Sequence, residues 1–297
     1  MPLFRRESGE ERTAHQLPEA KQAASSEALM SHDPTSAGGV PVPGRERLAQ
    51  LKGKLFTSNL SVKEFLLVKQ AGFDPLGLVL GSSIYHVGFD RSGWKESAES
   101  SVLSQAMYQA RELAMTRMVE EAGELGADGI VAVNLDIGRF QSEDEAAEFI
   151  AIGTAVKHRE GELQRAPSGR PFTSGLSGQD FWTLLSSGYR PVGLVMGSCV
   201  YHVGQRGLRE ELRQLEENYE MANYTQALYS ARELAMERMQ REAEELQAEG
   251  VVGVQLQQQS HGWDADVIEF FALGTAVVPT GEERKLPELS LTLSLTD

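Results

Sequence analysis

Residues 110–115 read Ala-Arg-Glu-Leu-Ala-Met, and the same six residues return in the same order at 231–236, 121 positions later. Gly-Thr-Ala-Val follows each of these runs, at 153–156 and at 274–277, and its two copies are also 121 positions apart. Self-similarity at a fixed spacing is typical of a repeated structural unit. The chain is therefore predicted to contain two copies of one module, each closing on Gly-Thr-Ala-Val.

The N-terminal halves of the two copies also match, at a slightly shorter spacing. Phe56-Thr57-Ser58 returns as Phe172-Thr173-Ser174, and Tyr85-His86-Val87-Gly88 returns as Tyr201-His202-Val203-Gly204, both 116 positions later. One net insertion of five residues between Gly204 and Ala231 of the second copy accounts for the change in spacing, and it is expected mainly to lengthen or bend the N-terminal part of the long helix there.

The residue pattern predicts the same first three elements in each module. A short strand around Phe56 (Phe172 in the second copy) is followed by a helix, because Ser61 and Glu64 have the spacing of a capping box. Gly72 and Pro75 end that helix. The apolar run 76–84 predicts a buried strand, with glycines where another backbone approaches closely. No phosphate-binding loop fits these glycines, since no Gly-Lys-Ser/Thr follows them.

A long helix and a β-hairpin complete each module. Apolar residues three and four apart predict a helix over 97–125, and over 208–246 in the second copy. Residues 129–137 alternate, with Val131, Val133, Leu135 and Ile137 expected on one side, and they pair with 148–156. By the same alternation Glu148 and Glu269 are expected to point outward. The Arg-Glu pairs of the long helices are expected to lie on a solvated face or to form an interface ion pair.

Composition sets the organisation of the rest of the chain. The chain has 297 residues, so two domains fit its length. The predicted division is a disordered tail over 1–50, modules over 54–158 and 170–278, a polar linker over 159–169 and a C-terminal tail over 279–297. Leu-Ser-Leu-Thr-Leu-Ser-Leu in the last tail could add an edge strand.

Charge and apolar content exclude several classes of partner. The formal net charge is −15, which repels phosphate backbones, so no nucleic acid is expected as a partner. No apolar run reaches the roughly 18 residues of a membrane span, and the N-terminus lacks the apolar stretch of a secretory signal. We therefore expect a cytoplasmic protein. The single cysteine, Cys199, excludes an intramolecular disulfide and has the apolar neighbours of an inert buried thiol.

The run 110–133, followed by Glu148-Phe-Ile-Ala-Ile-Gly-Thr-Ala-Val156, resembles the YbjQ family, which is labelled heavy-metal-binding. The resemblance covers each module. It implies an α+β fold of two tandem two-layer modules like the dodecin subunit, each a small antiparallel-containing sheet packed by a long helix. Single-domain members look like ring-forming homo-oligomers, so self-association is expected. The family offers no ligand motif that can be carried over residue by residue.

A metal site shared by both modules should use matching residues. The matching candidates selected are His86 with His202 and Glu112 with Glu233, for a divalent transition metal. One histidine per module cannot complete a zinc site, so such a site would lie between modules or subunits. A hydrogen-bonded structural histidine and solvated glutamates are the simpler interpretation.

Three functions remain open at this point. The leading hypothesis is a non-enzymatic assembly or binding protein, with tails that bind another protein. The alternative is binding of a heavy metal or small ligand at module or subunit interfaces. A hydrolase is the weakest alternative, because no pattern brings two carboxylates or a nucleophile and base together, and no catalytic residue is assigned.

Overall fold

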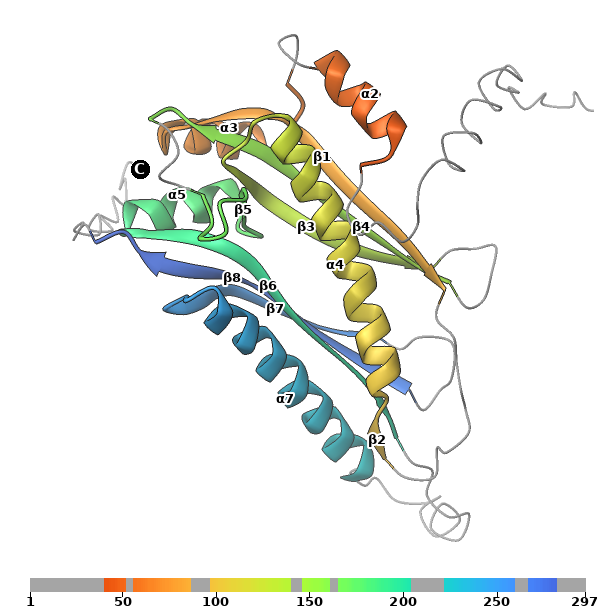
Figure 1. Cartoon of the computed structure of the whole chain (residues 1–297). Coiled ribbons are helices and arrows are strands. Elements are labelled where there is room, and N and C mark those ends of the chain that lie inside the picture. The colour runs from red at the N-terminus through yellow and green to blue at the C-terminus, as the bar shows by residue number, and fades with distance from the viewer. Residues whose placement is uncertain are drawn as a thin grey trace, which may run out of the picture.

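Two mixed helix-and-sheet modules make up the computed structural model, which describes residues 40–51, 56–86, 97–139, 146–160, 165–203, 222–259 and 267–281. Each module holds a four-stranded sheet and one long helix that crosses it (Figure 1). The predicted α+β fold of two tandem modules is confirmed.

The first module follows the order predicted from the sequence after Phe56. Ser61 and Glu64 form the capping box at the start of the first helix, and each binds the backbone N–H of the other. The sheet runs in the order β1-β4-β3, with antiparallel neighbours. The elements are α3 (Val62–Gln70), β1 (Phe73–His86), α4 (Ser101–Glu124), β3 (Gly129–Arg139) and β4 (Ala146–His158).

The second module repeats this arrangement with the strand order β6-β8-β7. Its helix α7 begins at Ala222, and the earlier start predicted at 208 lies outside the described residues. The elements are α5 (Gly178–Ser186), β6 (Tyr189–His202), α7 (Ala222–Glu245), β7 (Gly250–Gln259) and β8 (Val267–Pro279).

Short strands cross from each module to the sheet of the other. β5 (Phe172–Thr173) belongs to the second repeat, yet it pairs in parallel with β3 of the first. β2 (Ala98–Glu99) belongs to the first repeat and pairs with the end of β6. The strand predicted around Phe56 does not form: Thr57 and Ser58 contact Leu78 of β1 and Thr154 of β4 through their side-chain hydroxyls, and the Phe56 side chain is exposed.

The glycines of the predicted buried strands lie where a helix backbone approaches them. A Cβ atom on Gly81 would lie 1.9 Å from the carbonyl oxygen of Ala114 in α4. A Cβ atom on Gly197 would lie at the same 1.9 Å from the carbonyl oxygen of Ala235 in α7. Such distances admit only glycine, so the predicted close backbone approach is confirmed in both modules.

A bulge corrects the expected alternation of β3. The register of β3 against β4 shifts between Val131 and Asn134, and Ala132 has a left-handed φ of 52°. Val131 consequently packs with Phe172 and Phe181, while Val133 packs against α4. The side chain of Ile137 lies outside the described residues. β7 has the same irregularity, between Val252 and Gln255.

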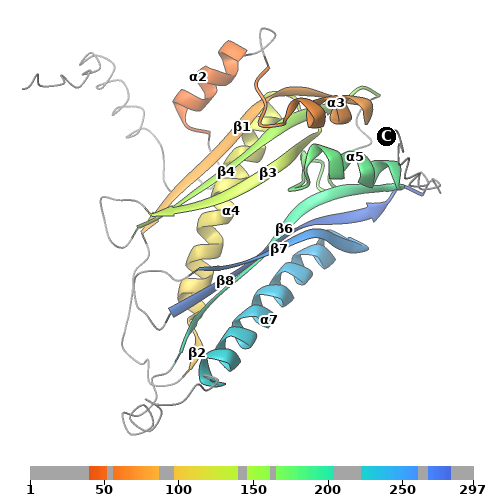
Figure 2. The ribbon, with the colours of Figure 1, turned by 180° about the vertical axis from the view of Figure 1, so that it is seen from behind.

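Helix α4 lies between the two sheets. Its residues share one apolar cluster with strands of both, including Val79 of β1 and Val200 of β6 (Figures 1 and 2). The molecule is therefore layered as first sheet, α4, second sheet and α7. Helix α7 covers only its own sheet, through Val195, Cys199 and neighbouring apolar residues.

An additional helix, α2 (Val42–Leu51), lies within the segment predicted to be a disordered tail. Leu48 is buried, and the Arg47 guanidinium donates to the carbonyl oxygen of Leu78 at 3.0 Å and to the Glu121 carboxylate at 2.6 Å. Residues 1–39 and 282–297 lie outside the described residues, as does the predicted C-terminal strand. None of the helices in the described part is long and apolar enough to span a membrane.

Candidate functional site

The contact between the two modules is organised around one buried ion pair. Arg111 on α4 donates from Nη2 to the carboxylate of Glu269 on β8, and both side chains are fully buried. The hydroxyl of Ser198 on β6 also donates to Glu269, at 3.0 Å. Removing two charges from water is costly, so this pair can exist only because each group has a partner.

Aromatic rings complete the surroundings of Arg111. The guanidinium carbon lies 4.1 Å from the ring centroid of Phe271 and 5.2 Å from that of Phe149, one from each module. Its Nε and Nη1 atoms have no hydrogen-bond partner among the described residues. The ring faces supply part of the attraction that hydrogen bonds would otherwise give.

Two further polar contacts cross the same junction. The backbone N–H of Val200 donates to the hydroxyl of Ser104 at 2.9 Å. The hydroxyl of Tyr108 on α4 donates to the carboxylate of Glu242 on α7. Burial raises the pKa of Glu242, and burial together with this hydrogen bond raises the pKa of Tyr108. Ser104, Tyr108 and Arg111 of α4 thus make polar contacts with the second module inside a contact that is otherwise apolar.

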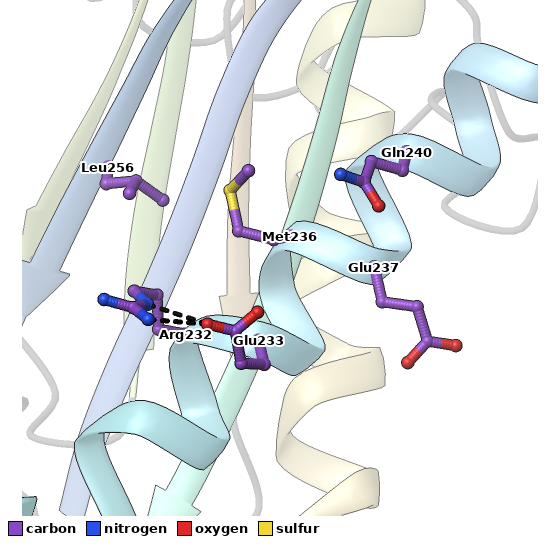
Figure 3. A pocket seen from close by; sticks show the side chains of 6 residues that line it. All are labelled: Arg232, Glu233, Met236, Glu237, Gln240 and Leu256. Atoms are coloured by element: carbon purple, nitrogen blue, oxygen red, sulfur yellow. Dashed lines mark hydrogen bonds and ion pairs between the residues drawn. The ribbon is translucent and has the colours of Figure 1, made fainter.

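In the second module the equivalent surface of α7 is not covered by any described part of the chain. Arg232, the counterpart of Arg111, points along the surface and pairs with its neighbour Glu233 at 2.6 Å (Figure 3). Met236 and Leu256 lie beside them and line a shallow hollow of about 470 Å³. We call the surface formed by Tyr229, Arg232 and Met236 of α7 with Val254 and Leu256 of β7 the α7 groove.

The first sheet has a surface equivalent to the side of the second sheet that packs against α4. Leu80 and Ile84 of β1 are exposed, and Glu148, Ile150 and Ile152 of β4 are partly exposed. Register places all five on one side of the sheet, away from α4, because residues directly opposite in an antiparallel pair share a face. We call this surface the outer face.

The residues selected from the sequence do not lie together. His202 is buried at the end of β6, opposite Ala98, while Glu112 lies in the middle of α4 near Arg170, where burial raises its pKa. Glu233 is paired with Arg232 in the α7 groove. The side chain of His86 lies outside the described residues.

The described residues do not fit a resident metal. Across the described ranges there is no group of three or more His, Cys, Asp and Glu side chains. Burial raises the pKa of the Cys199 thiol to about 12, so it is not a thiolate near neutral pH. Glu269 is already held by Arg111 and Ser198. The expected buried position of Cys199 is confirmed.

Comparison with known proteins agrees with the duplicated fold. The family YbjQ_1, with the description "Putative heavy-metal-binding", matches residues 92–159 and 189–280, one match in each module. The chain belongs to the YbjQ family. Two YbjQ matches in tandem confirm the resemblance and the duplication derived from the sequence.

YbjQ relatives occur in two lengths. A protein of Mycobacterium tuberculosis named "Encapsulin nanocompartment protein Rv1762c" is 49% identical over 238 residues, 80% of this chain and 90% of that protein. UPF0145 proteins of Pseudothermotoga lettingae and Clostridium novyi are 38% and 43% identical over 89 residues, 28% of this chain and 82% and 84% of theirs. The latter two are thus about one module long.

Sequence reasoning missed the residues that join the two YbjQ modules. Alternation predicts that Glu269 points outward, and the predictions for Arg111 are a solvated helix face or an interface ion pair; both residues are completely buried, in an ion pair between the modules. Alternation correctly directs Glu269 away from its own helix, α7. It could not reveal that α4 of the first module covers that side. The arginine and glutamate occur in both repeats, which is the only signal the sequence offered.

Proposed function

We propose that this chain is a non-enzymatic protein that assembles with further copies of itself. The observation that carries the proposal is the mismatch between the two modules. The α4 surface and the outward side of the second sheet are buried against each other, while the α7 groove and the outer face, built from equivalent positions, have no partner among the described residues. Exposed apolar surfaces of this kind mark sites of protein association.

The relative from Mycobacterium tuberculosis supports an assembly role. Its name assigns it to an encapsulin nanocompartment, and the match spans 90% of that protein. We therefore propose that this chain takes part in a protein nanocompartment in the cytoplasm. A net charge of −15 argues against nucleic acid as the enclosed or bound partner. Protein binding by the segments 1–39 and 282–297 stays a prediction.

The test is the mass of the full-length chain in solution. Native mass spectrometry and sedimentation velocity between about 0.1 and 50 µM, spanning the affinity range of specific complexes, should show a defined oligomer that dissociates on dilution. A monomer throughout that range would overturn the proposal. A broad distribution of masses without a preferred size would also overturn it, since nonspecific aggregation has no fixed stoichiometry.

Metal binding is a separate question, raised by the family description. His86 and His202 occupy equivalent strand positions, and each would need ligands from outside its own module. Native mass spectra of the chain with added zinc, copper or nickel would answer it. A stoichiometric metal that is lost in a His86→Ala, His202→Ala double variant would add metal binding to assembly as a function.

A further inference from the structure

The contact between the two modules of one chain can be repeated between two chains, because the surfaces that form it occur twice. This inference rests on the proposed function, self-assembly. The internal junction places α4 and β3 of one module against the outward side of the sheet of the other. α7 and β7 have the same positions in the second repeat as α4 and β3 in the first. β1 and β4 likewise correspond to β6 and β8.

Equivalent apolar positions are buried at the internal junction and exposed at the ends of the chain. Val200 of β6 is 0% exposed, whereas its counterpart Ile84 is 54% exposed. Leu135 of β3 is 3% exposed, whereas its counterpart Leu256 is 46% exposed. The outer face and the α7 groove therefore expose the apolar positions that are buried in the contact between the two modules.

The polar groups needed to close the junction are also present. Arg232 corresponds to Arg111, and Glu148 corresponds to Glu269. The Arg232 side chain remains 39% exposed and binds only the adjacent Glu233 and the ring face of Tyr229 among its described contacts. An arginine on one surface and a glutamate on the other make the two surfaces complementary in charge.

Gly250 also supports a contact between chains. At the internal junction Phe172 lies on Gly129, where an added Cβ would come within 2.1 Å of the ring. Gly250 is the counterpart of Gly129, and apart from its chain neighbours no atom of the described residues lies within 4 Å of the Cβ it would carry. The counterpart of Phe172 is Phe56, which is 47% exposed, against 1% for Phe172.

We propose that the α7 groove of one chain binds the outer face of a second copy, head to tail, in the manner of the internal junction. Arg232 pairs with Glu148 of the second copy. Residues Phe56 and Thr57 of the second copy add a parallel strand beside β7, with the Phe56 ring on Gly250, as β5 does beside β3. The two surfaces differ, so the contact is heterologous, and repetition closes a ring when the rotation permits it.

The internal and proposed junctions are not identical in sequence. Phe271, which stacks on Arg111, corresponds to Ile150. Gly178, whose added Cβ would lie 2.6 Å from Cβ of Glu64, corresponds to Val62. The contact between chains is therefore expected to be the weaker of the two, because it lacks one aromatic ring and carries one bulkier side chain.

Charge reversal in the full chain tests the pairing. Arg232→Glu and Glu148→Arg are each expected to raise the dissociation constant of the oligomer at least about 30-fold, since each leaves like charges at a buried contact. The double variant is expected to recover most of the wild-type affinity. Sedimentation velocity over a dilution series gives these constants.

Two controls and a second variant keep the result interpretable. Arg159→Glu and Asp74→Arg make the same charge changes at an exposed pair away from both surfaces, and should leave assembly unchanged. Gly250→Val should weaken assembly without lowering the melting temperature of the dissociated chain. An oligomer that is insensitive to Arg232→Glu, Glu148→Arg and Gly250→Val would overturn the head-to-tail contact while leaving self-assembly intact. A monomeric wild type would overturn both.

Discussion

Arg111 and Glu269 form an ion pair in which neither side chain reaches solvent, although they lie in different modules, 158 residues apart in sequence. The pair joins the helix of the first repeat to a central strand of the second. Because a buried charge without its partner is strongly unfavourable, these two residues make the correct docking of the modules a condition of folding.

Removing one member of this pair should destabilise the whole chain. Arg111→Ala is expected to lower the free energy of unfolding by about 3–5 kcal/mol, because Glu269 is left charged and buried. Urea unfolding followed by circular dichroism measures the change. Arg159→Ala, which breaks the exposed pair with Asp74, should leave the free energy of unfolding nearly unchanged, because solvent screens an exposed ion pair. Equal effects of the two variants would contradict the role given to burial.

A matched pair of glycine substitutions should separate folding from assembly. Gly129→Ala places a methyl group against the Phe172 ring and is expected to cost about 1–3 kcal/mol of stability. The Cβ atom added by Gly250→Ala lies within 4 Å of no atom of the described residues beyond its chain neighbours, so the melting temperature of this variant, at dilutions where the chain is monomeric, should match the wild type. Its oligomer should nevertheless dissociate more readily. A normal oligomer in Gly250→Ala would count against the placement of Phe56 there.

The pH dependence of stability should change when Glu242 is neutralised. Burial raises the pKa of this carboxyl group above its ordinary value of 4.5. A raised pKa in the folded state means that its contribution to stability is full below about pH 4.5 and is lost as pH rises through the folded pKa. Glu242→Gln should therefore gain in melting temperature relative to the wild type between pH 4.5 and 8.

The comparison variant for that titration is Glu244→Gln, which changes an exposed residue on the same helix. The difference in melting temperature between this variant and the wild type should stay constant across the same pH range. If the difference for Glu242→Gln were equally flat, burial of the Glu242 carboxyl group would not be coupled to folding.

Arg47 on α2 should compete with assembly. Its guanidinium donates a hydrogen bond to the carboxylate of Glu121. Glu242, the counterpart of Glu121, instead accepts a hydrogen bond from Tyr108 of the neighbouring module. Tyr229 of a second copy would occupy the equivalent place. Arg47→Ala is therefore expected to tighten self-association about fivefold, the effect of one hydrogen bond. Arg45→Ala, on the same helix and in an exposed pair with Glu124, should have no effect. Weaker association of Arg47→Ala would instead show that α2 supports the contact.

Local chemistry was sufficient to predict the elements of each module. The capping box at Ser61, the glycines that face the helices and the β-hairpins all depend on residues close in sequence or on one repeating pattern. The helix α2 was missed because its ten residues include Pro43 and Gly44 and show no apolar period. The bulge at Ala132 was missed because alternation assumes a continuous register.

The way in which the modules meet could not be predicted from either copy alone. Nearly identical patterns surround the equivalent arginines Arg111 and Arg232 and the equivalent glutamates Glu148 and Glu269. Arg111 and Glu269 are nevertheless buried, whereas Arg232 and Glu148 are partly exposed. A repeated sequence specifies the same surfaces twice. The helix surface of the first module and the sheet surface of the second are the copies that are covered, and the repeated pattern alone does not determine that choice.

The crossing of β2 and β5 means that the polypeptide connection between the repeats is not what holds them together. Each half completes the sheet of the other, at Tyr201–His202 and at Gly129–Ile130. A protease cut between His158 and Phe172 should leave two fragments that co-migrate until denaturant is added. The two halves are thus interlocked by the sheets they share, so that breaking the linker alone would not separate them.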